Sequence, residues 1–484
     1  MEENMEAGLL KKPLLLNDQT KPSTTENVHE QNGNGGGDCR VTPLVVLSTS
    51  AAVFGSFVFG CSVGYSSVTQ SAIMEELGLS VAAYSVFGSI MTFGGMIGAV
   101  ISGKIADLLG RRQTMWFTEI FCIFGWLAIA FAKDAWWLDL GRLSLGIGVG
   151  LFSYVIPVYI AEITPKTCRG GFTFANQLMM NCGISLVYIL GNIILWRTLA
   201  LLCVVPCFLQ VICLFFIPES PRWLAKHGRE KEFKAALQRL RGKNADISEE
   251  AFAIKETAET LEINQSKFGF FELFERRYAL SLVVGVGLMF LQQLSGCSGI
   301  SYYSGIILTK AGFSSSIGTT ALAIILIPKA LMGLIIVDKM GRRPLLMISA
   351  ALMCLCSLLV GFSFWMQGLH YMKELTPILA FIGLVGYITA NAIGMGGLPW
   401  VIMSEIFPMN VKASAGSLVT LANWSTGWLV TYTFNFMLQW SPIGTFYTFA
   451  GISGATIVFI WTLVPETKGR TLEEIHASFS NIVR

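Results

Sequence analysis

The feature that most limits the fold of this chain of 484 residues is a series of twelve apolar runs, each about 20 residues long or longer. About 20 helical residues cross a hydrocarbon layer of roughly 30 Å. Lipid offers no partner to a backbone N–H or C=O, so only helices and closed barrels span it. The runs lack the alternation of barrel strands, and we therefore predict a helical membrane protein. The predicted helices are 43–66, 84–103, 114–132, 136–159, 171–192, 198–217, 279–307, 317–337, 344–366, 376–402, 414–436 and 443–464.

Composition and charge agree with a membrane location. Apolar side chains make up 53% of the chain and charged ones 13%, which is more apolar surface than a soluble core requires. Of the 34 lysines and arginines, 28 lie in the two tails or in loops that follow an even-numbered run. Positive charge marks the cytosolic side, so we expect both termini and the 218–277 loop in the cytosol. The net charge of +3 follows from this bias and gives no reason to expect binding to nucleic acid.

The charged motifs at the edges of these runs occur twice, in the same order, about half a chain apart. The first copy reads Asp107-Leu-Leu-Gly-Arg-Arg, Glu162-Ile-Thr-Pro with Arg169, and Pro218-Glu-Ser-Pro-Arg. The second reads Asp338-Lys-Met-Gly-Arg-Arg, Glu405-Ile-Phe-Pro with Lys412, and Pro465-Glu-Thr-Lys-Gly-Arg. The matching acids are 231, 243 and 247 residues apart. Such a repeat indicates an internal duplication, and we predict two related halves of six helices.

The motifs also divide the chain into five segments. We predict a disordered cytosolic tail at 1–41, a six-helix half at 42–217, a cytosolic helical linker at 218–277, a second half at 278–464 and a cytosolic C-terminal tail at 465–484. Apolar residues recur with helical spacing at 226–241 and 247–263 of the linker. The linker either takes part in gating or connects the halves passively, and the sequence leaves both open.

The repeated charges are candidates for a cytosolic gate, because each half offers acids and bases at the same membrane face. A single exposed ion pair contributes only about 0–1 kcal/mol. Several pairs between the halves could bias a two-state equilibrium by a few kcal/mol. The alternative is that the charges only determine topology and loop shape. The candidate gate residues are Asp107, Arg111, Arg112, Glu162, Arg169, Glu219, Arg222, Asp338, Arg342, Arg343, Glu405, Lys412, Glu466 and Arg470.

Taken together, the motifs resemble those of a known family. They are Gly103-x-x-x-Asp107-x-x-Gly-Arg-Arg, Pro157-x-Tyr-x-x-Glu162, Pro218-Glu-Ser-Pro-Arg, Gln292-Gln-Leu-Ser-Gly and Pro465-Glu-Thr-Lys-Gly-Arg. From residue 42 to about 475 the chain resembles the sugar porters of the major facilitator superfamily, and more narrowly the plant early-responsive-to-dehydration (ERD)-type monosaccharide transporters. The resemblance implies alternating access to a sugar site at mid-membrane. We expect a monomer that binds sugar and lipid and carries no cofactor.

The sugar site should combine amide side chains with aromatic ones, because a sugar presents hydroxyl groups and one apolar face. Any single glutamine could instead form a hydrogen bond between helices. In the family the position of Ser298 carries an asparagine, and Ala392 and Leu326 replace polar residues of some relatives. Fewer polar anchors predict a weak or broad sugar preference. By resemblance, the substrate-binding residues are Gln177, Gln292, Gln293, Ser298, Trp400, Asn423 and Trp424.

Energy coupling depends on the first helix. In proton-coupled relatives a Phe-Gly-Tyr-Asp sequence supplies an acid that interacts with an arginine of the fourth helix. Here the sequence is Phe59-Gly-Cys-Ser62, while Arg142 is retained. Serine does not titrate near neutral pH, so we favour facilitated diffusion over proton coupling. Lys329 keeps the alternative open, since a base inside an apolar run is costly to bury; it is either a coupling group or a structural lysine.

The N-terminal tail contains a short sorting motif, Leu10-Lys-Lys-Pro-Leu14-Leu15. It resembles the dileucine signals that direct several plant relatives to the vacuolar membrane by way of sorting machinery. We therefore expect a vacuolar rather than a plasma-membrane protein. A basic tail beside the membrane, without a signal, is the alternative.

Two other classes of function are less consistent with the residues. A transporter-like sugar sensor would carry long signalling extensions, and these tails are short. An enzyme would need a nucleophile with a base, a metal cluster or a cofactor loop, none of which the sequence suggests. Gly146-x-Gly148-x-Gly150 lies inside an apolar run with no preceding strand, so we interpret it as a site of close helix packing rather than a phosphate loop.

Overall fold

The computed structural model is built from helices throughout the residues that it describes, which are 41–165, 168–265, 273–275, 278–369, 374–407 and 411–468. They belong to one compact unit, Arg40–Arg484. The first half contains α1 (Pro43–Leu77), α2 (Val81–Leu109), α3 (Arg111–Ala130), α4 (Ala135–Ile163), α5 (Arg169–Leu190) and α6 (Trp196–Leu214). The linker contains α7 (Pro221–Lys226), α8 (Glu230–Arg241) and α9 (Ser248–Gln265). The second half contains α10 (Ala279–Leu294), α11 (Cys297–Lys310), α12 (Ser315–Lys339), α13 (Arg342–Gly368), α14 (Leu375–Ile393), α15 (Leu398–Ile406), α16 (Lys412–Trp440) and α17 (Pro442–Leu463).

Capping side chains explain where several helices begin. The side chains of Thr42, Ser80, Asp134 and Ser441 each accept a hydrogen bond from the backbone N–H three residues later. This bond satisfies one of the amides that the first helical turn leaves without a partner. Local sequence therefore sets the starts of α1, α2, α4 and α17.

Two predicted helices are broken in the structure. The run 279–307 divides into α10 and α11 at Gly296, whose φ of 100° is easily adopted only by glycine. The run 376–402 divides into α14 and α15 across the stretch Gly394–Gly397. Our expectation of a continuous helix was wrong at both places, because the apolar composition continues through a break that the backbone conformation creates.

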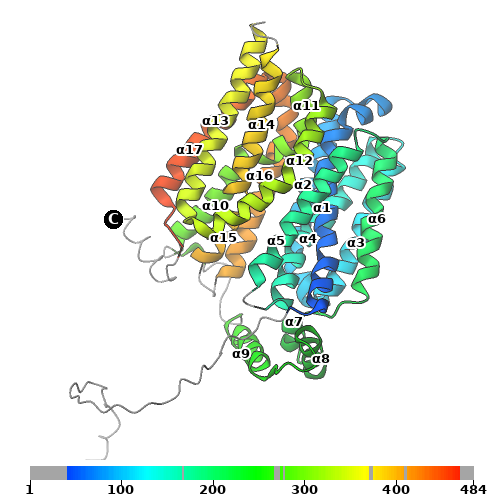
Figure 1. Cartoon of the computed structure of the whole chain (residues 1–484), viewed down its shortest axis with the longest axis vertical. Helices are drawn as coiled ribbons and strands as arrows, with labels where there is room; N and C mark the ends of the chain where they lie inside the picture. Colours follow the sequence, from blue (N-terminus) through cyan, green and yellow to red (C-terminus); the bar gives the residue numbers. More distant parts are fainter. Residues whose placement is uncertain are drawn as a thin grey trace, which may run out of the picture. The chain divides into compact units, whose positions relative to one another are not determined.

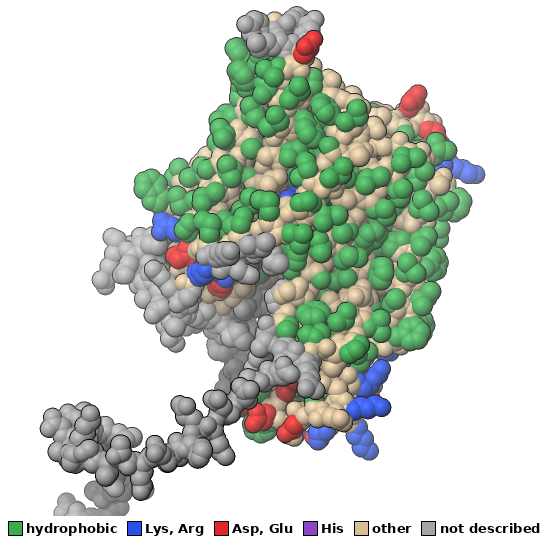
Figure 2. Space-filling model, in the orientation of Figure 1, with side chains coloured by type: hydrophobic (Ala, Val, Ile, Leu, Met, Phe, Trp, Pro, Cys, Tyr) green, Lys and Arg blue, Asp and Glu red, His purple; other side chains and the backbone are tan. Residues whose placement is uncertain are grey.

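The membrane character of the helices agrees with the prediction. Among the described residues, 11 helical segments are long and apolar enough to cross a membrane, counting α10–α11 and α14–α15 as one segment each. The remaining predicted span corresponds to α16, which has the length but carries polar residues such as Asn423 and Thr426 that face inward and are buried. Figure 2 shows hydrophobic side chains over the body of the bundle and charged ones mainly near its ends. The chain thus has the twelve-helix arrangement that the sequence predicted.

Glycines permit close contact between α2 and α4 in the first half. A Cβ added at Gly146 of α4 would collide with the carbonyl oxygen of Met91, and one at Gly98 of α2 would collide with that of Ile147. Only glycine allows the two backbones to approach so closely. The packing interpretation of the Gly-x-Gly-x-Gly sequence is therefore confirmed.

The linker helices form a small cluster of their own (Figure 1). Trp223 and Leu224 of α7 pack against Phe233 and Leu237 of α8. Helical patterning from 226 to 241 predicted one helix, but Gly228 has a φ of 67° and separates α7 from α8. Arg241 ties the cluster to the membrane part, since its Nη1 donates to the carbonyl of Ile163 at the end of α4 at 2.9 Å.

Among the described residues, the most extensive contacts between the two halves are those of α1 with α11, α2 with α16, and α5 with α12. Gly305 of α11 donates its N–H to Ser67 Oγ of α1 at 2.9 Å, and Asn435 Nδ2 of α16 donates to Ser85 Oγ of α2 at 3.1 Å. Both bonds lie toward the end of the bundle where α1 ends and α2 begins. The repeated charges lie at the opposite end of these helices. We call the end with the two bonds the latch face, and the end that carries the repeated charges the charge face.

Candidate functional site

The predicted amide residues of the second half form a connected group. Gln293 Nε2 donates to Asn423 Oδ1 at 3.4 Å, and Asn423 Nδ2 donates to Gln292 Oε1 at 3.0 Å. Ser298 Oγ donates to Gln293 Oε1 at 2.5 Å. The structure therefore brings together four of the seven predicted sugar-binding residues, from α10, α11 and α16. Such a group of donors and acceptors suits a ligand with several hydroxyls.

Gln292 also has a structural task. Its Nε2 donates to the backbone carbonyls of Met395 and Gly396, in the break between α14 and α15. The side chain is only 4% exposed, and its oxygen is already bonded to Asn423. Gln292 thus satisfies carbonyls that a continuous helix would have paired internally. The neighbouring Gln293 and Ser298 are half-buried and lie closer to open space.

The aromatic and remaining polar candidates occupy different positions. Trp424 of α16 stacks on Phe59 of α1 with ring centroids 6.5 Å apart, so it lies where the halves meet. Trp400 of α15 is half-buried and packs against the apolar core. Gln177 of α5 is exposed, and its backbone carbonyl accepts from Asn181 Nδ2 at 2.8 Å. These three residues are therefore not part of the hydrogen-bonded amide group.

Sequence reasoning missed one amide near this group. Asn391 of α14 donates its Nδ2 to Cys297 Sγ at 3.2 Å, while its Oδ1 is buried without a partner among the described residues. A useful signal was present, since an asparagine three residues before a Gly-x-Gly-Gly stretch in an apolar run is unusual. We had considered only Ala392 at this place.

The coupling candidates of the first half lie together. Arg142 is fully buried on α4, and its Nη1 donates to the backbone carbonyl of Ser62 at 2.7 Å. Its Nη2 donates to Ser66 Oγ at 2.5 Å, and the guanidinium carbon lies 4.5 Å from the ring centroid of Phe87. The Ser62 hydroxyl donates to Val58 O of its own helix at 2.9 Å. Carbonyl, hydroxyl and aromatic groups therefore surround this buried cation.

Lys329, the third coupling candidate, lies elsewhere. It is half-buried on α12, in the second half, directly after Pro328 inside that helix. Arg142 belongs to α4 of the first half, so the two basic residues of the apolar runs lie in different bundles.

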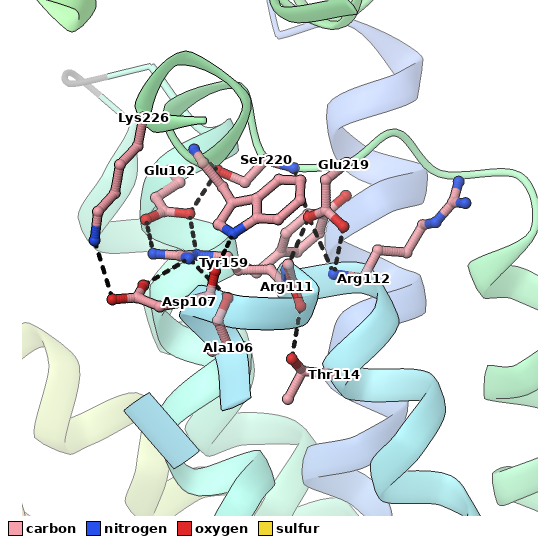
Figure 3. A network of polar contacts seen from close by, with 12 residues as sticks. Ala106, Asp107, Arg111, Arg112, Thr114, Tyr159, Glu162, Glu219, Ser220 and Lys226 are labelled. Carbon is pink, nitrogen blue, oxygen red and sulfur yellow. Dashed lines mark hydrogen bonds and ion pairs between the residues drawn. The ribbon is translucent and has the colours of Figure 1, made fainter. Parts of the chain in front are cut away.

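A dense charged network closes the charge face of the first half (Figure 3). Arg111 binds Glu162 with two hydrogen bonds, from Nε at 2.9 Å and from Nη2 at 3.0 Å. Its Nη1 also pairs with Asp107 Oδ1 at 3.1 Å. The side chains of Arg111 and Glu162 are only 9% and 12% exposed. This two-bond geometry is the strongest form of a guanidinium–carboxylate contact.

Glu219 caps the helix that Arg111 begins. Its Oε1 accepts from the backbone N–H of Arg111 at 2.9 Å, of Arg112 at 3.1 Å and of Ser220 at 2.8 Å. A carboxylate at this position satisfies amides that have no partner inside the helix. Burial nevertheless raises the pKa of Glu219, and the backbone donors only partly offset that effect.

The linker adds a further layer to this network. Ser220 Oγ donates to Glu162 Oε2 at 2.5 Å, and Trp223 Nε1 donates to the carbonyl of Asp107 at 2.8 Å. Lys226 Nζ pairs with Asp107 Oδ2 at 3.1 Å. Helix α7 is thus bonded to the ends of both α2 and α4.

Among its described side chains, which do not include that of Asp338, the second half repeats the cap and has a looser ion pair. Glu466 Oε1 accepts from the N–H of Arg342 at 2.9 Å, and its Oε2 accepts from that of Arg343 at 3.2 Å. Burial raises the pKa of Glu466, but backbone N–H donors outweigh burial and hold the pKa below its ordinary value. Arg342 meets Glu405 at 3.6 Å, with these side chains 20% and 29% exposed.

The observed pairs join elements of one half. The pairs expected between the halves stay a prediction, since several candidates lie outside the described side chains, while Arg111 with Glu162 and Arg342 with Glu405 each connect helices of the same bundle. The reason is geometric, because each loop motif follows a helix whose neighbours belong to its own bundle. Arg222 is exposed at the start of α7. Outside the described residues or side chains lie Arg169, Asp338, Lys412, Arg470, Leu10, Leu14 and Leu15.

Comparison with known proteins agrees with this fold. The family model "Sugar (and other) transporter" matches residues 47–479. The chain is 62% identical over 454 residues to sugar transporter ESL1 of Arabidopsis thaliana, with 94% of this chain and 96% of that protein covered. It is 56% identical over 496 residues to sugar transporter ERD6 of the same plant, with 100% and 99% covered.

Solved structures of one bacterial protein have the same architecture. The proton:xylose symporter XylE bound to 6-bromo-6-deoxy-D-glucose matches with a TM-score of 0.73 at 25% identity, covering 90% of this chain and 99% of that one. The inward-open conformation of the xylose transporter XylE from E. coli matches with a TM-score of 0.76 at 24% identity and the same coverage. Relatives and fold are those of transporters, not enzymes. The chain belongs to the sugar transporter family of the major facilitator superfamily.

Proposed function

We propose that the protein moves monosaccharides, hexoses such as glucose among them, by alternating access through the space beside Gln292, Gln293, Ser298 and Asn423. The observation that carries the proposal is the connected amide group of α10, α11 and α16. Gln177, Trp400 and Trp424 would complete the site as the bundle closes around the sugar. The printed names of ESL1 and ERD6 as sugar transporters support the substrate class.

Facilitated diffusion is the mode of transport that the first half favours. In the part of the chain that the structure describes, no carboxylate forms an ion pair with Arg142. Its Nη1 donates instead to the backbone carbonyl of Ser62. A serine in this position has no proton to exchange near neutral pH. Transport would then follow the sugar gradient alone.

A proton-coupled symporter is the second candidate. The retained Arg142 and the likeness to XylE, described as a proton:xylose symporter, favour it. In that case another group, for example Lys329, would have to carry the proton. A sugar sensor that binds without transport is a third and weaker reading.

Reconstitution into liposomes separates these functions. The full chain would be tested with labelled glucose, fructose and xylose, each with and without an inward pH gradient. We expect uptake of at least one sugar at a rate that the pH gradient leaves unchanged. Binding without uptake would favour a sensor, and proton influx that accompanies uptake would establish symport.

The vacuolar membrane is the location that we propose from Leu10, Leu14 and Leu15. A fluorescent fusion with Leu14→Ala and Leu15→Ala should leave the vacuole for another membrane. A fusion with Lys11→Ala and Lys12→Ala, which keeps the leucines, serves as the control. Retention of the leucine variant at the vacuole would remove the motif as a sorting signal.

A further inference from the structure

The end of α5 carries a polar seam that faces the second half. Ser185 and Tyr188 lie in the last turns of α5, and Asn192 lies in the turn that follows. Spacings of three and four residues place the three side chains on one side of the helix. Ser185 and Tyr188 are 5% and 3% exposed. The seam therefore lies inside the contact between α5 and the second half.

Each member of the seam bonds across the two halves. Ser185 Oγ donates to the carbonyl of Ala323 in α12 at 2.8 Å, and Tyr188 OH donates to the carbonyl of Ser301 in α11 at 3.1 Å. These acceptors are carbonyls inside helices, which can take a second hydrogen bond at little cost to the helix itself.

Asn192 has the richest set of partners. Its Nδ2 lies 2.9 Å from Thr319 Oγ1, 3.2 Å from Thr320 Oγ1 and 3.2 Å from the carbonyl of Ser316, all at the beginning of α12. The same nitrogen is 2.8 Å from the carbonyl of Tyr188. Its two N–H groups are thus shared between its own helix and the first turns of α12.

The seam lies at the latch face. Helix α5 begins beside the charged network that contains Glu162, and α12 ends just before the Arg342 cap, so the paired ends of these helices are those remote from the charges. Alternating access requires the two halves to separate at one end while they meet at the other. The α5–α12 contact must therefore open for a ligand to enter from the latch face.

We propose that the Ser185–Tyr188–Asn192 seam is an uncharged latch that holds the halves together at the latch face. Asn192 is its principal positioning residue. The latch uses amide and hydroxyl bonds, each of modest strength, so it can release in every transport cycle. The inference builds on the alternating-access function proposed above, but the latch itself is a property of the conformational equilibrium and needs no sugar.

The test measures the separation of the halves directly in the full chain. Trp136 and Trp440, which are 84% and 81% exposed, would be replaced by a keto-bearing amino acid that takes a spin label, so that the native cysteines stay untouched. One site lies on α4 and the other at the end of α16, both at the latch face and away from the seam. Pulsed electron resonance would then give the distribution of distances between the halves.

Asn192→Ala should increase the ratio of long to short distances about tenfold, the size expected for the loss of one or two uncharged hydrogen bonds. Thr319→Val should shift the ratio in the same direction, and the double variant should shift it by less than the product of the single effects, because the two side chains share a bond. Thr448→Val is the matched control, since among the described residues its hydroxyl bonds within α17, to Gly444 O at 2.8 Å.

An unchanged distribution in a monodisperse Asn192→Ala protein would overturn the latch, as would an equal shift in Thr448→Val. Independent, multiplicative effects of Asn192→Ala and Thr319→Val would also overturn it, because they would show that the pair does not act together. Failure of the unmodified protein to move sugar in liposomes would refute the transport proposal alone, since the distance measurement requires no sugar.

Discussion

The charge faces of the two halves carry the same motifs, but their described side chains differ in how tightly they pair. In the first half Arg111 holds Glu162 with two short bonds, in side chains that are almost fully buried. In the second half Arg342 reaches Glu405 only at 3.6 Å, in side chains that are more exposed. Both halves, however, place a glutamate on the first amides of the following helix, Glu219 in one and Glu466 in the other.

The comparison separates the helix cap, which both copies share, from the contacts that the linker adds to the first half. The helix cap is common to both copies because it needs only a carboxylate near two free amides. The tight pair occurs where α7 covers it, since Ser220 and Trp223 bond to Glu162 and to the carbonyl of Asp107. Coverage by the linker lowers the local exposure to water and so strengthens the pair.

Arg111→Ala should have the largest effect on this comparison. It leaves the Glu162 carboxylate buried without its cation, a loss of about 3–5 kcal/mol for buried pairs. Arg342→Ala, at the looser pair, should lose about 1 kcal/mol or less. The unfolding temperature of the purified protein in detergent measures both. Equal decreases for the two variants would show that the halves do not differ in the way their distances indicate.

Glu219→Gln should cost less stability at pH 7 than Glu466→Gln. Burial raises the pKa of Glu219, so the folded protein favours a neutral group there, which glutamine imitates. The pKa of Glu466 is lowered by its backbone donors despite burial, so the folded protein favours the carboxylate there. Unfolding temperatures of the two variants, measured beside the unmodified protein, test this order.

The pH dependence has opposite signs at the two glutamates. A carboxyl group whose pKa is lower in the folded protein than in the unfolded chain stabilises the fold at pH values above the unfolded-state pKa. This contribution is lost as the pH falls through the lowered, folded-state pKa. The stability that Glu466→Gln loses relative to the unmodified protein should therefore become smaller as the pH falls below 4.5, the ordinary glutamate pKa. At Glu219 the favourable contribution exists at low pH and disappears as the pH rises through the raised pKa. A deficit of Glu466→Gln that grows on acidification would contradict the assignment.

Lys226→Ala should have the smallest effect. Its pair with Asp107 spans 3.1 Å between side chains that are 31% and 43% exposed. Exposed pairs contribute about 0–1 kcal/mol and weaken with salt. Lys234→Ala is the matched control, because Lys234 pairs with Glu230 inside α8 and leaves α2 untouched. A large loss of stability for Lys226→Ala, without one for Lys234→Ala, would mean that α7 is held to the first half mainly by the Lys226–Asp107 pair. The hydrogen bond from Trp223 to the carbonyl of Asp107 would then be less important.

Much of the fold was predictable, and the reasons are visible in particular residues. Runs of about 20 apolar residues have few solutions in lipid, and caps such as Ser80 and Asp134 are local. The group of Gln292, Gln293 and Asn423 was predicted by resemblance, and the structure connects it. The breaks at Gly296 and Gly394 were not predicted, because glycine permits a break without requiring one.

The roles of individual site residues were harder to predict. Gln292 donates from its Nε2 to the carbonyls of Met395 and Gly396. Only the break between α14 and α15 in the folded protein brings these carbonyls within reach. The helical spacing of polar residues could have indicated Asn391 and the seam of α5. Spacing alone, however, does not predict which neighbouring helix a polar face contacts. The placement of Arg142 beside Ser62 followed from the resemblance and agrees with the structure.

The sequence by itself determined that this protein is a duplicated bundle of membrane helices with amides in its interior and charges at one face. These properties follow from hydropathy, repeat spacing and helix periodicity, which are encoded residue by residue. Only the tertiary structure decided that the described charge pairs Arg111–Glu162 and Arg342–Glu405 form within each half and that uncharged side chains at the end of α5 and in the following turn join the halves at the opposite face. The physical reason is that a pair depends on which helices pack together, and packing is a property of the whole fold.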